Sequence, residues 1–345
     1  MAAALAARGI AVDLATDARA TRYGGTFPAN AVHVIPSATL RGRNPLAYAK
    51  TAAMLGFGVA KAYLLLGRLR PAAVIGFGGY PSIPPVLAAS LRGIPTVIHE
   101  QNGVMGRANR LLAPRVNAIA TSFPGVVETE PALAAKATRT GNPLRPAVIA
   151  AAAVPYARPD AHGALRLLVF GGSQGARIMA DIVPPAVERL DAAVRARLAI
   201  VQQAREEDLE RVRGAYGRGG LAAEVAPFFP DLPARIAAAH LVVSRSGAST
   251  VAELAAIGRP AILVPLPHAL DQDQLANATV LMKAGGAVLL RQDALTPERL
   301  AAEIAALAAD PARLAAMAAG ARSAGVPDAA AQLADLVLRV ANLRQ

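Results

Sequence analysis

The chain has 345 residues, 54% of them hydrophobic and 17% charged, and it contains no cysteine. This composition excludes an intrinsically disordered chain, and the lack of cysteine excludes disulfide bonds, thiolate metal sites and a cysteine nucleophile. The formal net charge is +12, and almost all of it falls in residues 1–145, which carry 16 Lys and Arg against 5 Asp and Glu.

The first half of the chain alternates short apolar runs, typical of buried strands, with stretches of helical spacing. The expected strands are residues 10–16, 72–79, 95–101 and 117–122. Arg8 and Asp13 come too early for a secretory signal peptide. The uncharged run 71–91 contains four prolines, which disfavour a membrane-spanning helix there.

Segment 40–71 combines apolar and basic side chains. The apolar ones are Leu55, Phe57, Tyr63, Leu64, Leu65 and Leu66, and the cations are Arg41, Arg43, Lys50, Lys61, Arg68 and Arg70. An apolar patch rimmed by cations is typical of a segment that lies on an anionic membrane surface. Core packing and an ordinary solvated basic surface are the alternatives. Nucleic acid is not expected as the anionic partner, because only 4% of the residues are aromatic and no basic stretch interleaves with them.

The second half shows the same alternation of strands and helices. Its expected strands are residues 166–172, 198–203, 222–228, 240–247, 260–266 and 287–292. Segment 140–165 is rich in Ala and Pro, and we expect it to link two domains. Buried strands between helices predict an α/β fold, with a doubly wound parallel sheet in each domain.

Glycines and polar residues gather after five expected strands, at residues 76–80, 99–103, 171–177, 244–253 and 268–277. Open α/β sheets bind ligands at the carboxyl ends of their strands, so clusters shared by two domains predict a cleft between them. The glycine loop 171–177 precedes helical spacing, and backbone N–H groups at a helix start favour a phosphate. A tight turn without a ligand is the alternative.

The other clusters suggest further parts of a ligand. Residues 246–248 resemble a second phosphate or nucleoside site, and Glu253 suits a vicinal diol such as a ribose, unless it faces solvent. The amides and carboxylates of 268–277 suit a hydroxyl-rich ligand, and no recognised spacing favours a metal there. His99 and Glu100 are candidates for general acid–base work, although adjacent strand residues point to opposite faces.

Longer motifs identify a resemblance. The stretches "GFGGYPSIPPVLAASLRGIPTVIHEQNGVMGRANRLLA", "TGNPLR", "VFGGSQGAR", "SRSGASTVAELAAIGRPAILVPLPHALDQDQLANA" and "AGVPDAA" occur in the order and spacing of the MurG family. The chain resembles this family over essentially its whole length. The resemblance implies an inverting glycosyltransferase of peptidoglycan synthesis. Such enzymes move N-acetylglucosamine from UDP-N-acetylglucosamine to the C4 hydroxyl of MurNAc in undecaprenyl-pyrophosphoryl-MurNAc-pentapeptide, which converts lipid I to lipid II.

The resemblance also implies the GT-B architecture of two Rossmann-like domains facing a cleft. Residues 1–145 and a C-terminal helix at 329–345 would form the acceptor and membrane-associated domain, and residues 146–328 the UDP-sugar donor domain. The family uses no metal or cofactor. It implies a peripheral protein at the cytoplasmic face of the plasma (inner) membrane, with lipid I, an anionic membrane surface and proteins of cell-wall synthesis or division as partners.

Site residues follow from the same resemblance, position by position. The donor-binding ones are Asn102, Arg145, Ser173, Phe229, Ala248, Ser249, Thr250, Val251, Ala252, Glu253 and Gln274. Arg145 and Ser173 would meet the pyrophosphate, and the segment around Phe229 the uracil, through its backbone. Glu253 would take the ribose diol and Gln274 the sugar hydroxyls. Tyr80 and Gly79 are candidates for the acceptor side.

The sequence departs from the family in one respect. The family begins with a strand and a "GGTGGH" loop whose histidine is a leading candidate for the catalytic base, whereas here Met1 aligns within the following helix. Either the start codon lies further upstream or the gene product is truncated. We therefore expect the chain as it stands to be a poor catalyst, with His99 and Glu100 as the remaining candidates for the base. Another GT-B transferase acting on a lipid acceptor, a UDP-sugar-binding remnant, and a nicotinamide-dependent oxidoreductase are the alternatives. The oxidoreductase requires a GxGxxG spacing that neither glycine loop has.

Overall fold

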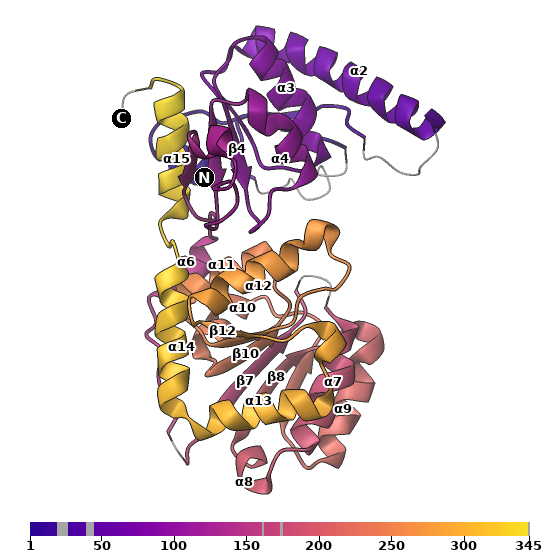
Figure 1. Ribbon diagram of the computed structural model, residues 1–345, viewed down its shortest axis with the longest axis vertical. Helices are drawn as coiled ribbons and strands as arrows, with labels where there is room; N and C mark the ends of the chain where they lie inside the picture. The colour runs from indigo at the N-terminus through magenta and orange to yellow at the C-terminus, as the bar shows by residue number, and fades with distance from the viewer. Residues whose placement is uncertain (19–26, 39–44, 161, 173–174, 344–345) are drawn as a thin grey trace. The chain divides into compact units, whose positions relative to one another are not determined.

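The computed structural model describes residues 1–18, 27–38, 45–160, 162–172 and 175–343 (Figure 1). The chain divides into two compact units, each with its own sheets and core. The first unit comprises Met1–Pro143 and Asp328–Gln345, and the second comprises Leu144–Pro327.

The first unit contains two separate parallel sheets. The smaller pairs β1 (Leu14–Thr16) with β2 (Val32–Val34), and the larger has the order β3-β4-β5-β6. The strands of the larger sheet are β3 (Val74–Gly76), β4 (Thr96–Glu100), β5 (Ala118–Thr121) and β6 (Ala137–Arg139). The helices of this unit are α1 (Ala2–Ala6), α2 (Pro45–Leu69), α3 (Ile83–Leu91), α4 (Arg107–Leu112), α5 (Pro131–Ala134) and α15 (Ala329–Val340).

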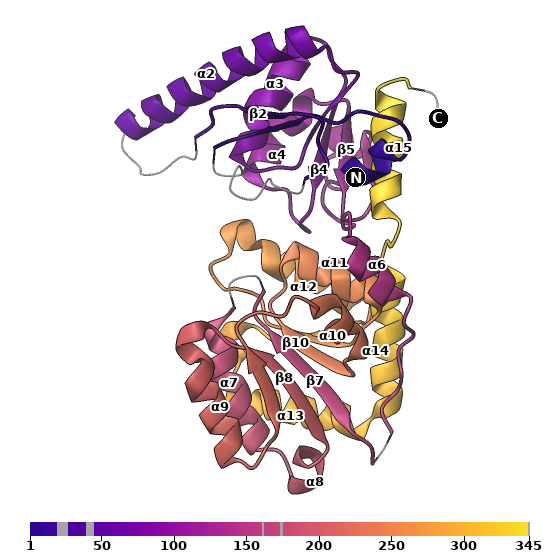
Figure 2. The same cartoon turned by 180° about the vertical axis from the view of Figure 1, so that it is seen from behind.

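Strand alternation in β4 and β5 sends side chains to opposite faces of the larger sheet. Ile98 and Ile119 are paired in register and pack in the core that α3 and α4 cover. Val97 and Ala118 are also paired, and they pack against α15 on the other face. Figures 1 and 2 show these two helical layers. Because the alternation continues, His99 lies on the α15 face and Glu100 on the α4 face.

The second unit contains one parallel sheet in the order β12-β11-β10-β7-β8-β9. Its strands are β7 (Leu165–Phe170), β8 (Leu198–Gln203), β9 (Ala223–Ala226), β10 (Leu241–Ser244), β11 (Ala261–Leu263) and β12 (Ala287–Leu289). The chain enters at β7, runs outward to β9, returns to β10 and then runs outward to β12. The order therefore reverses between β7 and β10, and this switch point is where doubly wound sheets bind ligands.

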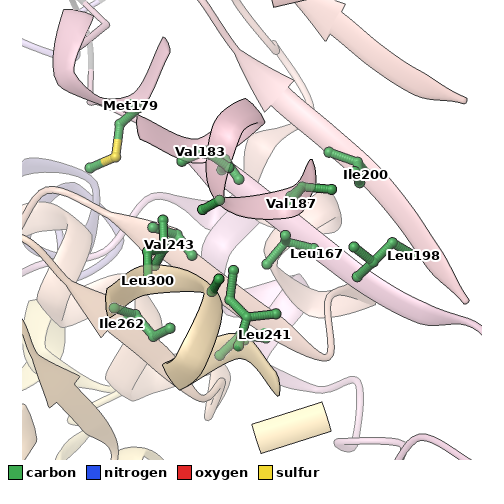
Figure 3. Close-up of a cluster of buried hydrophobic side chains, with 14 of the residues drawn as sticks. Leu167, Met179, Val183, Val187, Leu198, Ile200, Leu241, Val243, Ile262 and Leu300 are labelled. Carbon is green, nitrogen blue, oxygen red and sulfur yellow. The ribbon is translucent and has the colours of Figure 1, made fainter. Parts of the chain in front are cut away.

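Helices cover both faces of this sheet. They are α6 (Pro146–Ala152), α7 (Arg177–Glu188), α8 (Ala192–Arg195), α9 (Leu209–Arg218), α10 (Leu232–Ala238), α11 (Ala248–Ile257), α12 (Asp273–Lys283), α13 (Pro297–Ala309) and α14 (Pro311–Ala324). Figure 3 shows one side of the core, where apolar residues of β7, β8, β10 and β11 meet α7 and α13. The predicted α/β fold with two doubly wound parallel domains is confirmed.

Two details differ from the expectation. The proposed linker 140–165 is wrong for residues 146–152, because they form α6, which packs against α10 and α11. Strands β2 and β6 were not expected. Both have only three residues, and no residue of either is fully buried.

Helix α2 has one face held against the first unit and one exposed. Ala62 and Leu66 are buried with residues of α3, and a methyl group on Gly58 would lie 2.1 Å from Pro36 O. By length and composition, Ala47–Leu69 is apolar enough to cross a membrane, and only 17% of its most apolar window is buried in the unit. The helix therefore packs on the unit through one narrow face and leaves most of its surface exposed.

Candidate functional site

The glycine loop lies at the carboxyl end of β7, beside the switch point of the second sheet. Gly171 must lack a side chain, because a Cβ there would lie 2.2 Å from Ala176 N. Gly172 and Gly175 adopt φ values of 92° and 68°, which side chains disfavour. Ser173 lies outside the described residues. The loop leads into α7 at Arg177, which places a helix N-terminus beside it.

A second helix N-terminus follows β10. Helix α11 begins at Ala248 after Gly247, and four of the five residues 248–252 are buried or half-buried, Ser249 being exposed. Val251 is fully buried and donates its N–H to Gly247 O over 3.0 Å. The expected ligand-binding stretch therefore offers small groups at its start and core residues at its end.

Glu253 does not face solvent freely. Only 8% of this residue is exposed, and Arg145 Nη2 donates to Glu253 Oε1 over 3.0 Å. Arg145 precedes α6, and its own side chain is 65% exposed. The fold thus brings together two residues that are 108 positions apart in sequence, one expected at the pyrophosphate and one at the ribose.

Gln274 is tied to the loop after β11. Its Oε1 accepts the Leu266 N–H over 3.1 Å, and its carbonyl oxygen accepts the Ser246 hydroxyl over 2.8 Å. Asn277 donates to Ser246 O over 3.1 Å. Ser246 therefore joins the start of α12 to the turn after β10, so the clusters 244–253 and 268–277 lie side by side.

Phe229 follows β9, and its ring is unavailable for stacking on a base. The residue is 5% exposed, and the Arg235 guanidinium lies 4.4 Å from the ring centroid. Arg235 is held there by Glu224 and Asp231, which also raise its pKa. Any contact of Phe229 with a ligand must use its backbone.

In the first unit, Glu100 organises the loop after β4. Its oxygens accept the Asn102 N–H over 3.0 Å, the Gly106 N–H over 2.9 Å and the Asn109 amide over 2.8 Å. Asn102 Nδ2 adds a fourth contact at 3.4 Å. Because the carboxylate is 2% exposed and so well bonded, its role in the structure is to shape this loop.

His99 is fully buried, and both of its ring nitrogens are bonded. Nε2 donates to Gly141 O over 2.9 Å, and Nδ1 accepts from the Gln101 amide over 3.0 Å. Burial lowers the pKa of His99, which keeps the ring neutral. With both nitrogens occupied, the ring has no free lone pair for a substrate proton.

The candidate acceptor residues precede α3. Gly79 adopts a φ of 69°, is exposed and caps the short helical turn Tyr80–Ser82. Tyr80 is half-buried and packs against the core beneath α3 and α4. The Ser82 hydroxyl donates to Gly78 O over 2.6 Å and fixes the glycine turn.

Sequence reasoning missed two residues that shape these sites. Arg245, 8% exposed, donates to Val264 O and Pro265 O over 3.1 and 3.0 Å and to Gln292 Oε1 over 2.6 Å, so it fixes the loop after β11. Asn109 supports Glu100 from α4. Arg245 could have been singled out from the sequence, because a charged residue directly after a buried apolar strand needs hydrogen-bond partners. The described residues contain no group of three His, Asp or Glu that could hold a metal ion.

The sequence matches two known domains. The glycosyltransferase family 28 N-terminal domain matches residues 1–121, and the C-terminal domain of the same family matches residues 166–333. A relative from Rhodopseudomonas palustris (strain BisB18) is 64% identical over 99% of this chain and 91% of its own. Another, from Nitrobacter hamburgensis, is 61% identical over 97% of this chain and 91% of its own. Both are named UDP-N-acetylglucosamine–N-acetylmuramyl-(pentapeptide) pyrophosphoryl-undecaprenol N-acetylglucosamine transferase.

Solved structures agree. The crystal structure of Acinetobacter baumannii MurG superposes with a TM-score of 0.80 at 29% identity, over 97% of this chain and 92% of that one. The calicheamicin glycosyltransferase CalG4 superposes at 0.62 with 18% identity, over 98% and 93%, which shows the shared fold alone. From its sequence and its fold, the chain belongs to glycosyltransferase family 28, and within it to the MurG family of N-acetylglucosamine transferases.

Proposed function

We propose that the chain transfers N-acetylglucosamine from UDP-N-acetylglucosamine to the C4 hydroxyl of MurNAc in undecaprenyl-pyrophosphoryl-MurNAc-pentapeptide, converting lipid I to lipid II in peptidoglycan synthesis. The observation that carries this proposal is the identity of more than 60% to transferases of that name over nearly the whole chain. The loops at the switch point of the second unit supply a site of matching chemistry.

In this proposal the second unit binds the donor. The diphosphate lies against the glycine loop and the N-termini of α7 and α11, whose N–H groups favour negative charge. Arg145 turns from Glu253 to the diphosphate, and Glu253 then accepts both hydroxyls of the ribose. The sugar meets Gln274, whose Nε2 is a donor for its hydroxyl oxygens. The exchange of one partner of Arg145 for another keeps its charge paired throughout.

The chemistry requires a leaving diphosphate and a deprotonated acceptor hydroxyl. As the acceptor hydroxyl gives its proton to a general base and its oxygen bonds to the anomeric carbon from the opposite face, the bond to the diphosphate oxygen breaks and negative charge moves onto UDP. Arg145 and the loop N–H groups stabilise that charge. The hydrogen bonds of His99 and Glu100 support positioning roles in the loop after β4, beside Tyr80 and Gly79, and not the role of the base.

The first unit is proposed to lie on the cytoplasmic face of the plasma membrane as a peripheral protein. The support is the exposed face of α2, where Phe57, Lys61, Leu64 and Arg68 follow one another at helical spacing. Phe57 and Leu64 are 62% and 63% exposed. Leu66 does not belong to this patch because it is buried, and Arg41 and Arg43 lie outside the described residues. Proteins of cell-wall synthesis or division would be further partners there.

The test is transfer of labelled N-acetylglucosamine to a soluble lipid I analogue. The proposal expects a labelled product with this acceptor and none with diacylglycerol, which a related lipid glycosyltransferase would prefer. UDP-N-acetylgalactosamine, which differs at one hydroxyl, serves as the donor control. Labelling of diacylglycerol instead of the lipid I analogue would replace the proposal with that alternative.

A further inference from the structure

Gln203 connects the two segments that flank the proposed nucleotide site. It is the last residue of β8, which lies between β7 and β9 in the sheet. The Gly171 N–H donates to Gln203 Oε1 over 3.1 Å, and Gln203 Nε2 donates to Pro227 O over 3.1 Å. One amide therefore bridges the glycine loop after β7 and the segment that leads to Phe229 after β9.

The orientation of the Gln203 amide is fixed by its two partners. Gln203 is 6% exposed, so both ends of its amide need partners inside the protein, and each end has one of the right kind. An acceptor at one end and a donor at the other are what this pair of backbone groups requires. Neither a hydrophobic residue nor a carboxylate can satisfy both.

The preceding residue provides a matched comparison. Gln202 is fully buried and also makes two side-chain hydrogen bonds, donating to Met179 O over 3.2 Å and accepting from the Tyr216 hydroxyl. Met179 and Tyr216 belong to the core beneath α7 and α9, on the opposite face of the strand. The two glutamines thus share type, strand and burial, but only Gln203 touches the candidate site.

The position of the Pro227 carbonyl matters because the proposed donor site places the base of the nucleotide against backbone groups of the segment that follows it. The ring of Phe229 is buried beneath Arg235, and its N–H has no acceptor among the described residues. A fixed N–H donor complements the O4 acceptor of uracil. It opposes the exocyclic amine of cytosine, which is itself a donor, and a mismatch of that kind leaves a buried polar group unpaired.

We propose that Gln203 is a positioning residue that sets the selectivity of the donor site for uracil over cytosine. It does so by holding the segment 227–229 at a fixed distance from the glycine loop. The inference rests on the proposed function, since it takes a uridine nucleotide as the ligand of this site. It predicts that base selectivity and diphosphate binding respond differently to substitution at this position.

The experiment compares Gln203→Met with Gln202→Met in the full chain. Dissociation constants for UDP and CDP are measured by calorimetry, and thermal unfolding monitors the cost to the fold. We expect Gln203→Met to lower the preference for UDP over CDP by about fivefold or more, the scale of one lost hydrogen-bond match. Gln202→Met should lose thermal stability and keep the preference of the parent chain. Hydrogen exchange of peptides covering residues 226–230 should rise in the first variant only.

The inference is overturned if the ratio of the dissociation constants for CDP and UDP is unchanged in Gln203→Met. It is also overturned if this ratio falls equally in Gln202→Met. If Gln203→Met does not fold, Gln203→Glu replaces it. This variant keeps the acceptor for the Gly171 N–H and loses only the donor to Pro227 O, and its charge affects both diphosphates alike. A parent chain that binds neither nucleotide refutes the donor assignment of the proposed function, and the role of Gln203 falls with it.

Discussion

Arg145 and Glu253 form an ion pair of 3.0 Å between the start of α6 and the middle of α11. The carboxylate is mostly buried, whereas the guanidinium is largely exposed and free to turn. The pair holds the Glu253 carboxylate in a fixed orientation. Binding then exchanges one set of charged contacts for another and does not create a buried charge.

Replacing Glu253 tests its role at the ribose. Glu253→Ala should weaken UDP binding by about 1.5–3 kcal/mol, the scale of hydrogen bonds to a charged group. The parent chain should prefer UDP to 2′-deoxy-UDP, and the variant should bind both equally, because the diol partner is gone. Calorimetric titration with both ligands measures this. A variant that still prefers UDP would place the ribose elsewhere.

The exposed face of α2 can be tested on vesicles. Lys61→Gln combined with Arg68→Gln should weaken binding to anionic vesicles by roughly 1 kcal/mol per charge at low salt. Arg218→Gln with Arg313→Gln, two exposed positions of the second unit, removes the same charge and should have no effect. Co-sedimentation gives the affinities. An equal loss of vesicle affinity in the two double variants would mean that the overall charge of the protein, and not α2, determines membrane binding.

Folding of the second unit should weaken in mild acid because of His240. Burial lowers the pKa of His240 to about 4, and its Nδ1 accepts the Arg166 N–H over 3.1 Å. The unfolded chain, whose histidine titrates near its ordinary value of about 6.5, binds the proton first. Stability is therefore complete above about pH 6.5 and falls progressively towards pH 4. Urea unfolding at several pH values should show this slope.

The control for that slope is His240→Asn. Its side-chain oxygen can accept the same N–H but does not titrate, so the variant should be less sensitive to pH between 6.5 and 4. The free energy of unfolding of the variant at neutral pH should stay close to that of the parent. An unchanged pH slope in the variant would assign the acid sensitivity to other groups.

Arg259 should be among the most costly positions to change. It is 1% exposed, and its guanidinium donates to the carbonyl oxygens of five residues, Val154, Pro155, Ala237, Ile257 and Gly258. Burial lowers its pKa to about 10, so it stays charged at neutral pH. Arg259→Met should lower the free energy of unfolding by about 3 kcal/mol or more, because it leaves buried carbonyls unpaired. Arg313→Met on the exposed side of α14 is the matched control in urea titrations.

The sequence predicted all six strands of the second unit, and β3, β4 and β5 of the first, because most of them contain apolar runs, as in β7 and β10. It did not predict β2 (Val-His-Val) or β6 (Ala-Thr-Arg), which are only three residues long and have no fully buried residue. Helix α6 was also missed, because its alanine-rich sequence has no polar face and therefore no helical periodicity. Its packing against α10 and α11 is visible only in the structure. Local pattern therefore identified the apolar strands, including the edge strands β9 and β12, and missed two short strands that have no fully buried residue.

The same limit applies to the candidate site. Glycines and polar residues after strands marked the loops, because strand ends and φ requirements are local properties. The partners of those residues are not local. Arg145 meets Glu253 across 108 positions, and Gln203 reaches Gly171 and Pro227 across 32 and 24. Only the order of strands in the sheet determines such neighbours, and no spacing in the sequence encodes it.

Helix α15 belongs to the first unit although it follows the whole of the second unit in the chain. Leu333, Leu336 and Val337 cover Val97, Ala118 and Ala120 of β4 and β5. During synthesis on a ribosome, that face of the first sheet stays uncovered until residues near 340 have emerged. The second unit, continuous in sequence, can fold earlier. The first unit is thus completed only after the second unit has been made, and until then one apolar face of its sheet stays uncovered.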